Sequence, residues 1–320
     1  MNPIGGVKAI LGATGDGGVD WPAAGDAARD LTDSGTLEIS APVREGYARD
    51  IKAAHREVSA VSGIEFAVPR TLEVQNRHHW IDGTLETLEL GFEPLANVGG
   101  SVPAVTGPVN TASVAGSVAY LSRRVLGQYD PHLFSDAGDH GLYIVHPNIV
   151  AGATELSVDF DRFRRWIAFH EVTHAAEFGA APWLRGYLSD RVQAIVAELT
   201  HSSVPRQPYR ELNRAMTAVE GYAELLMDEA FDEQSADLRR KLDDRRDSGG
   251  PFARLIGRLL GLEIKREQYE RGRAFFEVIE SQRGVAGASR VWDDPSYLPR
   301  SAELETPRRW LDRVPQAGGA

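Results

Sequence analysis

The segment His170-Glu171-Val172-Thr173-His174 has the spacing H-E-x-x-H. On an α-helix each residue turns about 100°, so the two histidines lie about 40° apart and one turn along the axis. Both imidazoles can then reach one metal ion, and Glu171 is close enough to accept a proton from a water molecule on that ion. With nine histidines in 320 residues, chance produces this pattern in roughly one chain in fifty. The pattern predicts zinc on His170 and His174, with Glu171 as general base.

An apolar stripe surrounds both histidines. Phe163, Ile167, His170, His174 and Phe178 follow one another at spacings of four, three, four and four, which places them on one face of a helix. Burying two imidazoles without partners costs free energy, and a shared metal ion removes that cost. The alternative is a pair of buried histidines, each hydrogen-bonded to the backbone.

A zinc site with an open position needs a third protein ligand. The long metzincin motif would have glycine at 177 and histidine at 180, whereas this chain has Glu177 and Ala180, so that class is excluded. A glutamate on a later helix is the other common solution, and Glu220 is the candidate. Its rival is His201, which follows the next predicted helix and lies beside two serines.

Glu220 borders an apolar stripe of Met216, Ala223 and Met227, where an unpaired carboxylate would be unfavourable. Glu224 follows one helical turn later, and we expect it to hold a ligand histidine in place without binding the metal itself. The alternative is an amphipathic helix whose acidic side chains are solvated.

The composition narrows the chemistry further. Cysteine is absent, so a transition metal must be held by nitrogen and oxygen ligands. The net charge of −11 argues against a nucleic-acid partner, because phosphates need a basic surface. No run of about 18 apolar residues is present, and the N-terminus lacks the pattern of a secretory signal. We therefore expect a cytoplasmic protein without a membrane partner, and the sequence leaves its oligomeric state open.

The elements that must position these residues are mostly helices. Residues 141–150 (GLYIVHPNIV) are the best strand candidate, because they are short, β-branched and bounded by glycine and proline. Residues 1–20 are glycine-rich and predict a flexible lead-in, followed by a single mainly helical domain over 21–320 with a small sheet (α+β). The predicted helices are 40–61, 80–95, 112–126, 158–178, 182–200, 207–230, 234–246, 252–260 and 264–281.

The chain also resembles a known family. The H-E-x-x-H motif followed by Glu220-Gly221-Tyr222-Ala223-Glu224 is similar to the gluzincins, whose third ligand often opens an E-G-F/Y-A helix. More specifically, the chain resembles a bacterial family of zincin-like proteins, known as zinc-dependent metallopeptidases or as coenzyme F-420 biosynthesis-associated hydrolases. The matching segments are LGQYDP (126–131), YIVHPNI (143–149), WIAFHEVTHAAEF (166–178), VEGYAELLMD (219–228), KREQYERGRAFF (265–276) and AELETPRRWLDRV (302–314). The resemblance implies a zincin-like fold with zinc on His170, His174 and Glu220.

The reaction expected from these residues is hydrolysis of an amide bond in a peptide or a small amide. Zinc would activate water and polarise the carbonyl, and Glu171 would transfer the proton to the leaving group. A further donor should stabilise the oxyanion, and its candidates are Tyr222, Tyr269, Arg271 and His201. By analogy with zincins, strand 141–150 is expected to hold an extended peptide along the cleft.

Two other functions remain open. The chain could be a metal-stabilised scaffold or binding protein, although Glu171 has no structural need in such a protein. It could also hydrolyse a small amide or ester, such as a polyglutamylated coenzyme linked to deazaflavin metabolism. A narrow pocket would favour the small substrate, and an open groove would favour the peptidase.

Overall fold

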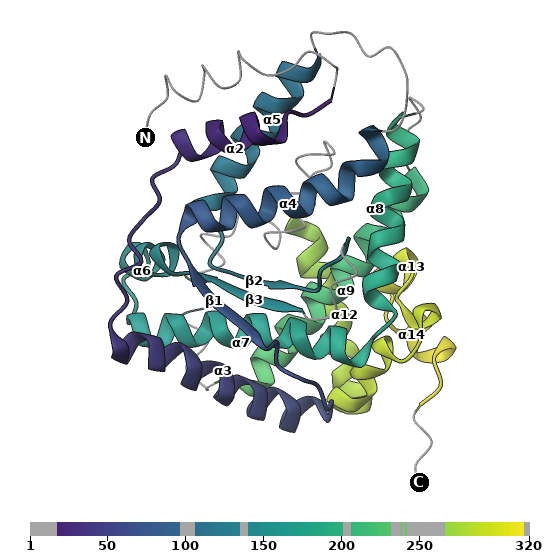
Figure 1. Cartoon of the computed structure of the whole chain (residues 1–320). Coiled ribbons are helices and arrows are strands. Elements are labelled where there is room, and N and C mark those ends of the chain that lie inside the picture. The colour runs from purple at the N-terminus through teal and green to yellow at the C-terminus, as the bar shows by residue number, and fades with distance from the viewer. Residues whose placement is uncertain are drawn as a thin grey trace.

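The helix with the H-E-x-x-H motif, α7 (Phe160–Ala180), lies along one face of a three-stranded sheet (Figure 1). The computed structural model describes residues 18–96, 106–134, 140–200, 206–231, 238, 241 and 266–316. Helix α7 begins where the Asp159 side chain accepts a hydrogen bond from the Arg162 backbone N–H at 2.9 Å. Such a cap satisfies an N–H group that has no partner within the helix.

The sheet has the strand order β1-β3-β2. The central strand β3 (Gly141–Val145) runs parallel to β1 (Thr71–Gln75) and antiparallel to β2 (Gly127–Asp130). Apart from the half-buried Tyr143, the residues of β3 are buried. Strands β1 and β2 therefore form the two edges of the sheet, and β2 is the edge that contacts α7.

The predicted strand 141–150 is wrong beyond residue 145. Helix α6 (His146–Glu155) begins there, with Pro147 in its first turn. Proline lacks an N–H for the sheet, and its fixed φ suits the first turn of a helix. The sequence patterns also do not predict the strands β1 and β2 or the helix α2 (Trp21–Asp30).

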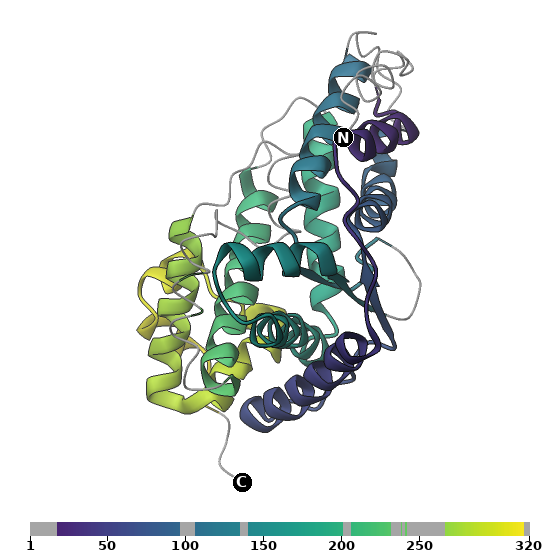
Figure 2. The ribbon, with the colours of Figure 1, turned by 90° about the vertical axis from the view of Figure 1, so that its left-hand side faces the viewer.

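Helix α3 (Ala41–Ser62) packs alongside α7 and supports it from the side away from the sheet (Figures 1 and 2). A buried ion pair joins the two helices, with Nε of Arg164 2.7 Å from a carboxylate oxygen of Asp50. Gly46 leaves room for this guanidinium, since a Cβ at residue 46 would lie 2.4 Å from Cζ of Arg164. The site helix is thus held on two sides.

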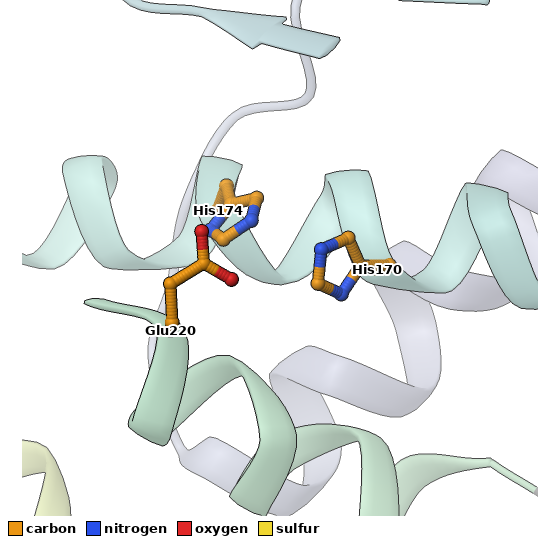
Figure 3. A group of neighbouring side chains, drawn as sticks. All are labelled: His170, His174 and Glu220. Atoms are coloured by element: carbon orange, nitrogen blue, oxygen red, sulfur yellow. The ribbon is translucent and has the colours of Figure 1, made fainter. Parts of the chain in front are cut away.

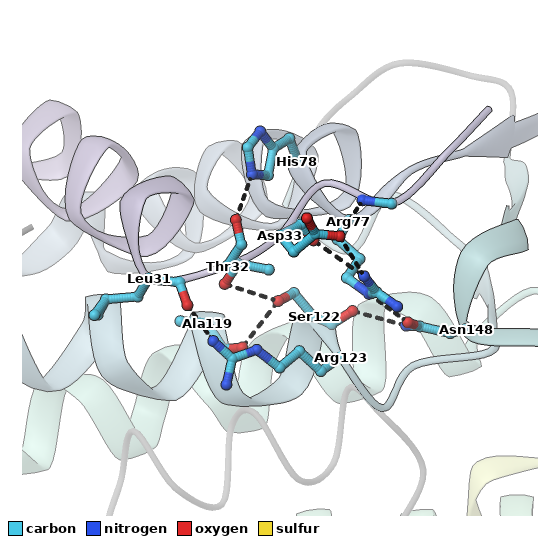
Figure 4. A network of polar contacts seen from close by, with 10 residues as sticks. Leu31, Thr32, Asp33, Arg77, His78, Ala119, Ser122, Arg123 and Asn148 are labelled. Carbon is cyan, nitrogen blue, oxygen red and sulfur yellow. Dashed lines mark hydrogen bonds and ion pairs between the residues drawn. The ribbon is translucent and has the colours of Figure 1, made fainter. Parts of the chain in front are cut away.

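The opposite face of the sheet is covered by α4 (Arg77–Ala96), and α2 and α5 (Thr106–Ser122) pack against α4 (Figure 1). A polar network holds these elements together (Figure 4). Asn148 is fully buried, accepts a hydrogen bond from Arg77 and donates to the carbonyls of Ser122 and Val125. Because Val125 lies just before β2, this network also fixes where β2 enters the sheet.

A second group of helices packs around α9 (Arg206–Ala230), which itself contacts α7. It comprises α8 (Leu184–Thr200), α9 and α12 (Arg266–Ser289), followed by the short helices α13 (Ser301–Glu305) and α14 (Arg308–Arg313). Helices α9 and α12 touch through two glycines. A Cβ on Gly221 would lie 2.5 Å from the carbonyl carbon of Gly272, and one on Gly272 would lie 2.4 Å from the carbonyl oxygen of Thr217. The glycine that follows Glu220 is therefore required by this close crossing.

The structure confirms the predicted fold class, a mainly helical protein with a small sheet. The predicted helix 112–126 ends four residues early, at Ser122, because the chain then turns into β2. The predicted helices 234–246 and 252–260 fall almost entirely outside the described residues. No helix within the described ranges is long and apolar enough to cross a membrane.

Replacing Gly221 with alanine should lower the free energy of unfolding by about 1–3 kcal/mol, because the added methyl group meets the backbone of α12. Gly116 provides a matched control, since it is an exposed helical glycine with nothing within 4 Å of the position that a methyl group would occupy. Gly116→Ala should leave stability unchanged or raise it by up to about 1 kcal/mol. Urea unfolding followed by circular dichroism measures both effects, and equal effects would contradict this account of the crossing.

Candidate metal centre

His170, His174 and Glu220 lie together between α7 and α9 (Figure 3). One ligand atom from each residue lies within 4.8 Å of the others, and the two imidazole centroids are 4.8 Å apart. The histidines lie on successive turns of one helix, whereas the carboxylate reaches them from the other helix. Two imidazole nitrogens and one carboxylate oxygen form a donor set that zinc binds in catalytic sites.

Glu220 reaches this group because α9 packs its apolar face against α7. Val219 and Ala223 on that helix are buried, and Glu220 itself is only 6% exposed. A carboxylate in such surroundings requires a compensating charge or hydrogen bonds. A dication between Glu220 and the two histidines would supply that compensation.

Glu177 fixes the orientation of His174. Its Oε2 lies 2.8 Å from Nδ1 of His174, and its side chain is completely buried. A carboxylate that accepts the Nδ1–H leaves Nε2 of the same ring as the ligand atom. Among the described residues, Oε1 of Glu177 has no hydrogen-bond partner.

The buried carboxylates create a strongly negative environment around His174. Burial by itself lowers the pKa of His174, but the contact with Glu177 outweighs it and, with the charges of Glu220 and Glu171, raises that pKa to about 9. Burial also raises the pKa of Glu177 to about 7, although His174 acts in the opposite direction. A positive charge is therefore favoured at this position, which fits a dication.

Glu171 is hydrogen-bonded to the edge strand β2 and is not one of the three candidate ligands. The backbone N–H of Tyr129 donates to Oε2 of Glu171 at 2.8 Å, and the residue is 5% exposed. At Gly127, an added Cβ would lie 2.8 Å from Cγ of Glu171. Glycine is thus needed for the strand to pass directly over this carboxylate, which lies beside the predicted metal and outside the predicted ligand set.

A pocket opens above these residues. Its floor contains His170, Glu171, His174 and Glu220, and one wall is formed by Gln128, Tyr129 and Asp130 of β2. The remaining lining residues are Thr87, Pro131, Leu133, Phe178, Leu188, Met216 and Val219. Neither lysine nor arginine lines the pocket among the residues that the structure describes.

Tyr129 lines this pocket and carries a phenol hydroxyl group. That hydroxyl lies 2.8 Å from Nδ1 of His140, and the phenol ring packs on Phe178 with centroids 5.3 Å apart. Burial, together with the charges of Asp130 and Glu177, raises the pKa of Tyr129. The hydroxyl therefore keeps its proton and can donate a hydrogen bond.

The described oxyanion donors predicted from the sequence do not line the pocket. Tyr222 is fully buried and its hydroxyl lies 2.7 Å from Oγ of Ser289, while Arg271 is exposed and does not line the pocket. His201 and the side chain of Tyr269 lie outside the described residues. Glu224 is buried on α9, and its role in holding a ligand histidine stays a prediction.

The strand expected along the cleft is also different. Strand β3 is central in the sheet, so β2 and not 141–150 borders the pocket.

Sequence reasoning misses Glu177, Tyr129 and His140 as parts of the site. Two of them lie in segments that carry the family resemblance, Tyr129 in LGQYDP and Glu177 in WIAFHEVTHAAEF. From the sequence alone, Glu177 indicates only that the long metzincin motif is absent. Its spacing of three from His174 on one helix is a usable signal, because such residues are neighbours on a helix surface.

Comparison with known proteins identifies the family. The chain matches zincin-like metallopeptidases over residues 19–207 and 196–311, which together are most of its length. It belongs to this family. Membership implies zinc as the cofactor, and the two imidazoles and carboxylate described above fit that metal.

A solved structure from Chloroflexus aurantiacus, described as a candidate hydrolase with a novel fold, is similar to this family member. The two share 29% identity with a TM-score of 0.80, and the alignment covers 94% of this chain and 100% of the other. A search of curated proteins finds no match. The family and this structure together support a hydrolase.

Replacing Glu177 with glutamine should weaken zinc binding by about 10- to 100-fold, because His174 loses the carboxylate that fixes its ring. Competition with a zinc chelator measures the affinity, and circular dichroism verifies the fold. Glu224→Gln is the paired variant, because Glu224 is also a buried acid and follows Glu220 by one turn of α9. A larger loss in the Glu224 variant than in the Glu177 variant would contradict the assignment to Glu177.

Proposed function

We propose that the protein is a zinc-dependent peptidase that cleaves an amide bond in an extended peptide, with Glu171 as general base. The observation that carries the proposal is the position of Glu171. This buried carboxylate lies beside the His170–His174–Glu220 group and is held by the backbone of the sheet edge. A scaffold protein would need the three ligands and would gain nothing from a further acid held beside them.

The residues divide the chemistry among them. Nε2 of His174, one imidazole nitrogen of His170 and the carboxylate of Glu220 would hold zinc. When bound, zinc lowers the pKa of a water molecule and polarises a carbonyl group. Glu171 accepts the proton of the attacking water and delivers it to the leaving nitrogen.

The edge of β2 supports a peptide over a small substrate. The N–H of Tyr129 bonds to Glu171 and so points away from β3, which means that the outer edge of β2 runs beside the general base. Glu171 already takes the outward N–H of Tyr129, so an extended peptide would pair with the outward carbonyl groups of β2. Its scissile bond would then lie next to Glu171 and the predicted metal.

We assign the oxyanion donor to Tyr129. Tyr129 lines the pocket, whereas the hydroxyl of Tyr222 is engaged in the core. When Nδ1 of His140 carries a proton, it donates to the phenol oxygen of Tyr129, and the phenol O–H is free to donate to an oxyanion. A donor that is already oriented stabilises the developing negative charge without reorganisation of the site.

The direct test of the function is to load the purified protein with zinc and screen a broad peptide library. We expect about one zinc per chain and cleavage of a subset of the peptides. Glu171→Gln should keep the metal and lose at least about 100-fold in turnover, because the general base is gone. Undiminished cleavage by this variant would sink the mechanism, and the absence of stoichiometric zinc after reloading would sink the metal site.

Tyr129→Phe tests the oxyanion donor and should lower kcat by about 100- to 1000-fold with little change in KM. The backbone N–H that anchors Glu171 is retained in this variant, so an effect on the base is avoided. Tyr143→Phe, on the neighbouring strand and outside the pocket, is the control and should have wild-type turnover. If the two variants turn over substrate equally, Tyr129 is not the donor.

A further inference from the structure

The pocket beside the candidate metal centre has an apolar wall built from several parts of the chain. Leu133 follows β2, Leu188 lies on α8 and Val219 lies on α9, and all three are buried. Phe178 and Met216 complete this wall and are only partly buried. Since different elements converge on it, the wall is a built feature of the site and extends beyond the surface of any one helix.

The wall directly flanks the predicted ligands. Phe178 lies one helical turn after His174 on α7, and Met216 lies one turn before Glu220 on α9. Residues four apart on a helix share a face. Each helix that supplies ligands therefore also supplies an apolar side chain next to them, at the distance of one turn.

The charges in the pocket are all acidic apart from the two histidines. Asp130 lines it together with Glu171 and Glu220, and no lysine or arginine in the described part of the chain does. A dication would be balanced by the two glutamates. Asp130 accepts a hydrogen bond from the backbone N–H of His132 at 2.7 Å and adds a further carboxylate to the lining, which disfavours an anionic group there. A substrate carboxylate placed against the apolar wall would also lose its hydration without gaining a partner.

We infer that this pocket takes an uncharged, apolar side chain adjacent to the scissile amide, so that the substrate class is a peptide with an aliphatic or aromatic residue at that position. The same features disfavour oligoglutamyl chains. The inference rests on the proposed function, and it decides between the two hydrolase substrates that the sequence leaves open.

Two peptide hydroxamates that differ in one side chain test the inference without requiring turnover. One carries an isobutyl group and the other a carboxyethyl group, and both are titrated calorimetrically into the zinc-loaded full-length protein. The isobutyl compound should bind at least about 10-fold more tightly, because burial of an isobutyl group against an apolar wall raises the binding affinity by at least that factor. Equal affinities, tighter binding of the carboxyethyl compound, or binding of neither would overturn the inference.

A charge placed in the wall provides the second arm of the test. Met216→Arg should reduce the preference to less than about 3-fold, because the guanidinium pairs with the carboxyethyl group. Val150→Arg is the matched control, since Val150 is a 42% exposed apolar residue on α6 and does not line the pocket. That variant should keep the wild-type preference. If the Met216→Arg protein also keeps the wild-type preference, the apolar wall does not contact the side chain of the hydroxamate.

Phe178→Ala covers the case in which Met216→Arg fails to fold. It should weaken binding of the isobutyl compound several-fold and leave binding of the carboxyethyl compound unchanged, and an equal effect on both would overturn the inference. The peptide library separates the two proposals. Tighter binding of the isobutyl hydroxamate without any peptide cleavage would support the apolar pocket and refute the peptidase. Cleavage mainly beside acidic residues would support the peptidase and refute the apolar pocket.

Discussion

Three buried carboxylates from two helices lie close to the imidazole of His174, and this concentration of negative charge is the constraint on which the rest of the structure depends. Glu171, Glu177 and Glu220 are each at most 6% exposed. Buried carboxylates are tolerated only where charges or hydrogen bonds compensate them. Each of the first two has a visible compensation, a backbone N–H for Glu171 and an imidazole for Glu177. A dication shared with the two histidines would further compensate Glu220.

Helix α7 meets this constraint by giving each of its faces a different partner. One face carries His170 and His174 toward α9, a second places Glu171 under β2, and a third joins α3 through Arg164. Because three sides of one helix are engaged, the candidate ligands and the candidate base keep a fixed relation to each other. The reaction proposed here needs such a fixed relation, since a base and an attacking water must be aligned before the chemistry begins.

The sequence predicts the parts of this arrangement that depend on helical periodicity. The H-E-x-x-H spacing and the apolar stripe around it are enough to place His170, Glu171 and His174 on one helix, and the stripe near Glu220 indicates a buried acid. The strands β1 and β2 could not be predicted because they are short and mostly not buried, so their sequences lack a regular alternation of apolar and polar residues. The role of Tyr129 could not be predicted either, since it depends on β2 crossing α7 at Gly127, a contact between residues more than forty positions apart. Pro147 misleads in isolation, because it suits both the end of a strand and the start of a helix.

The contact of Gly221 with Gly272 connects the candidate metal centre to the C-terminal helices. It joins the helix that bears Glu220 to α12, and α12 in turn packs against α14 through Phe275 and Trp310, whose ring centroids are 5.7 Å apart. A ligand that binds only the folded arrangement stabilises every element on which that arrangement depends. Zinc bound through Glu220 would therefore be thermodynamically linked to the packing of the C-terminal helices, and each would strengthen the other although α14 contributes no residue to the candidate site.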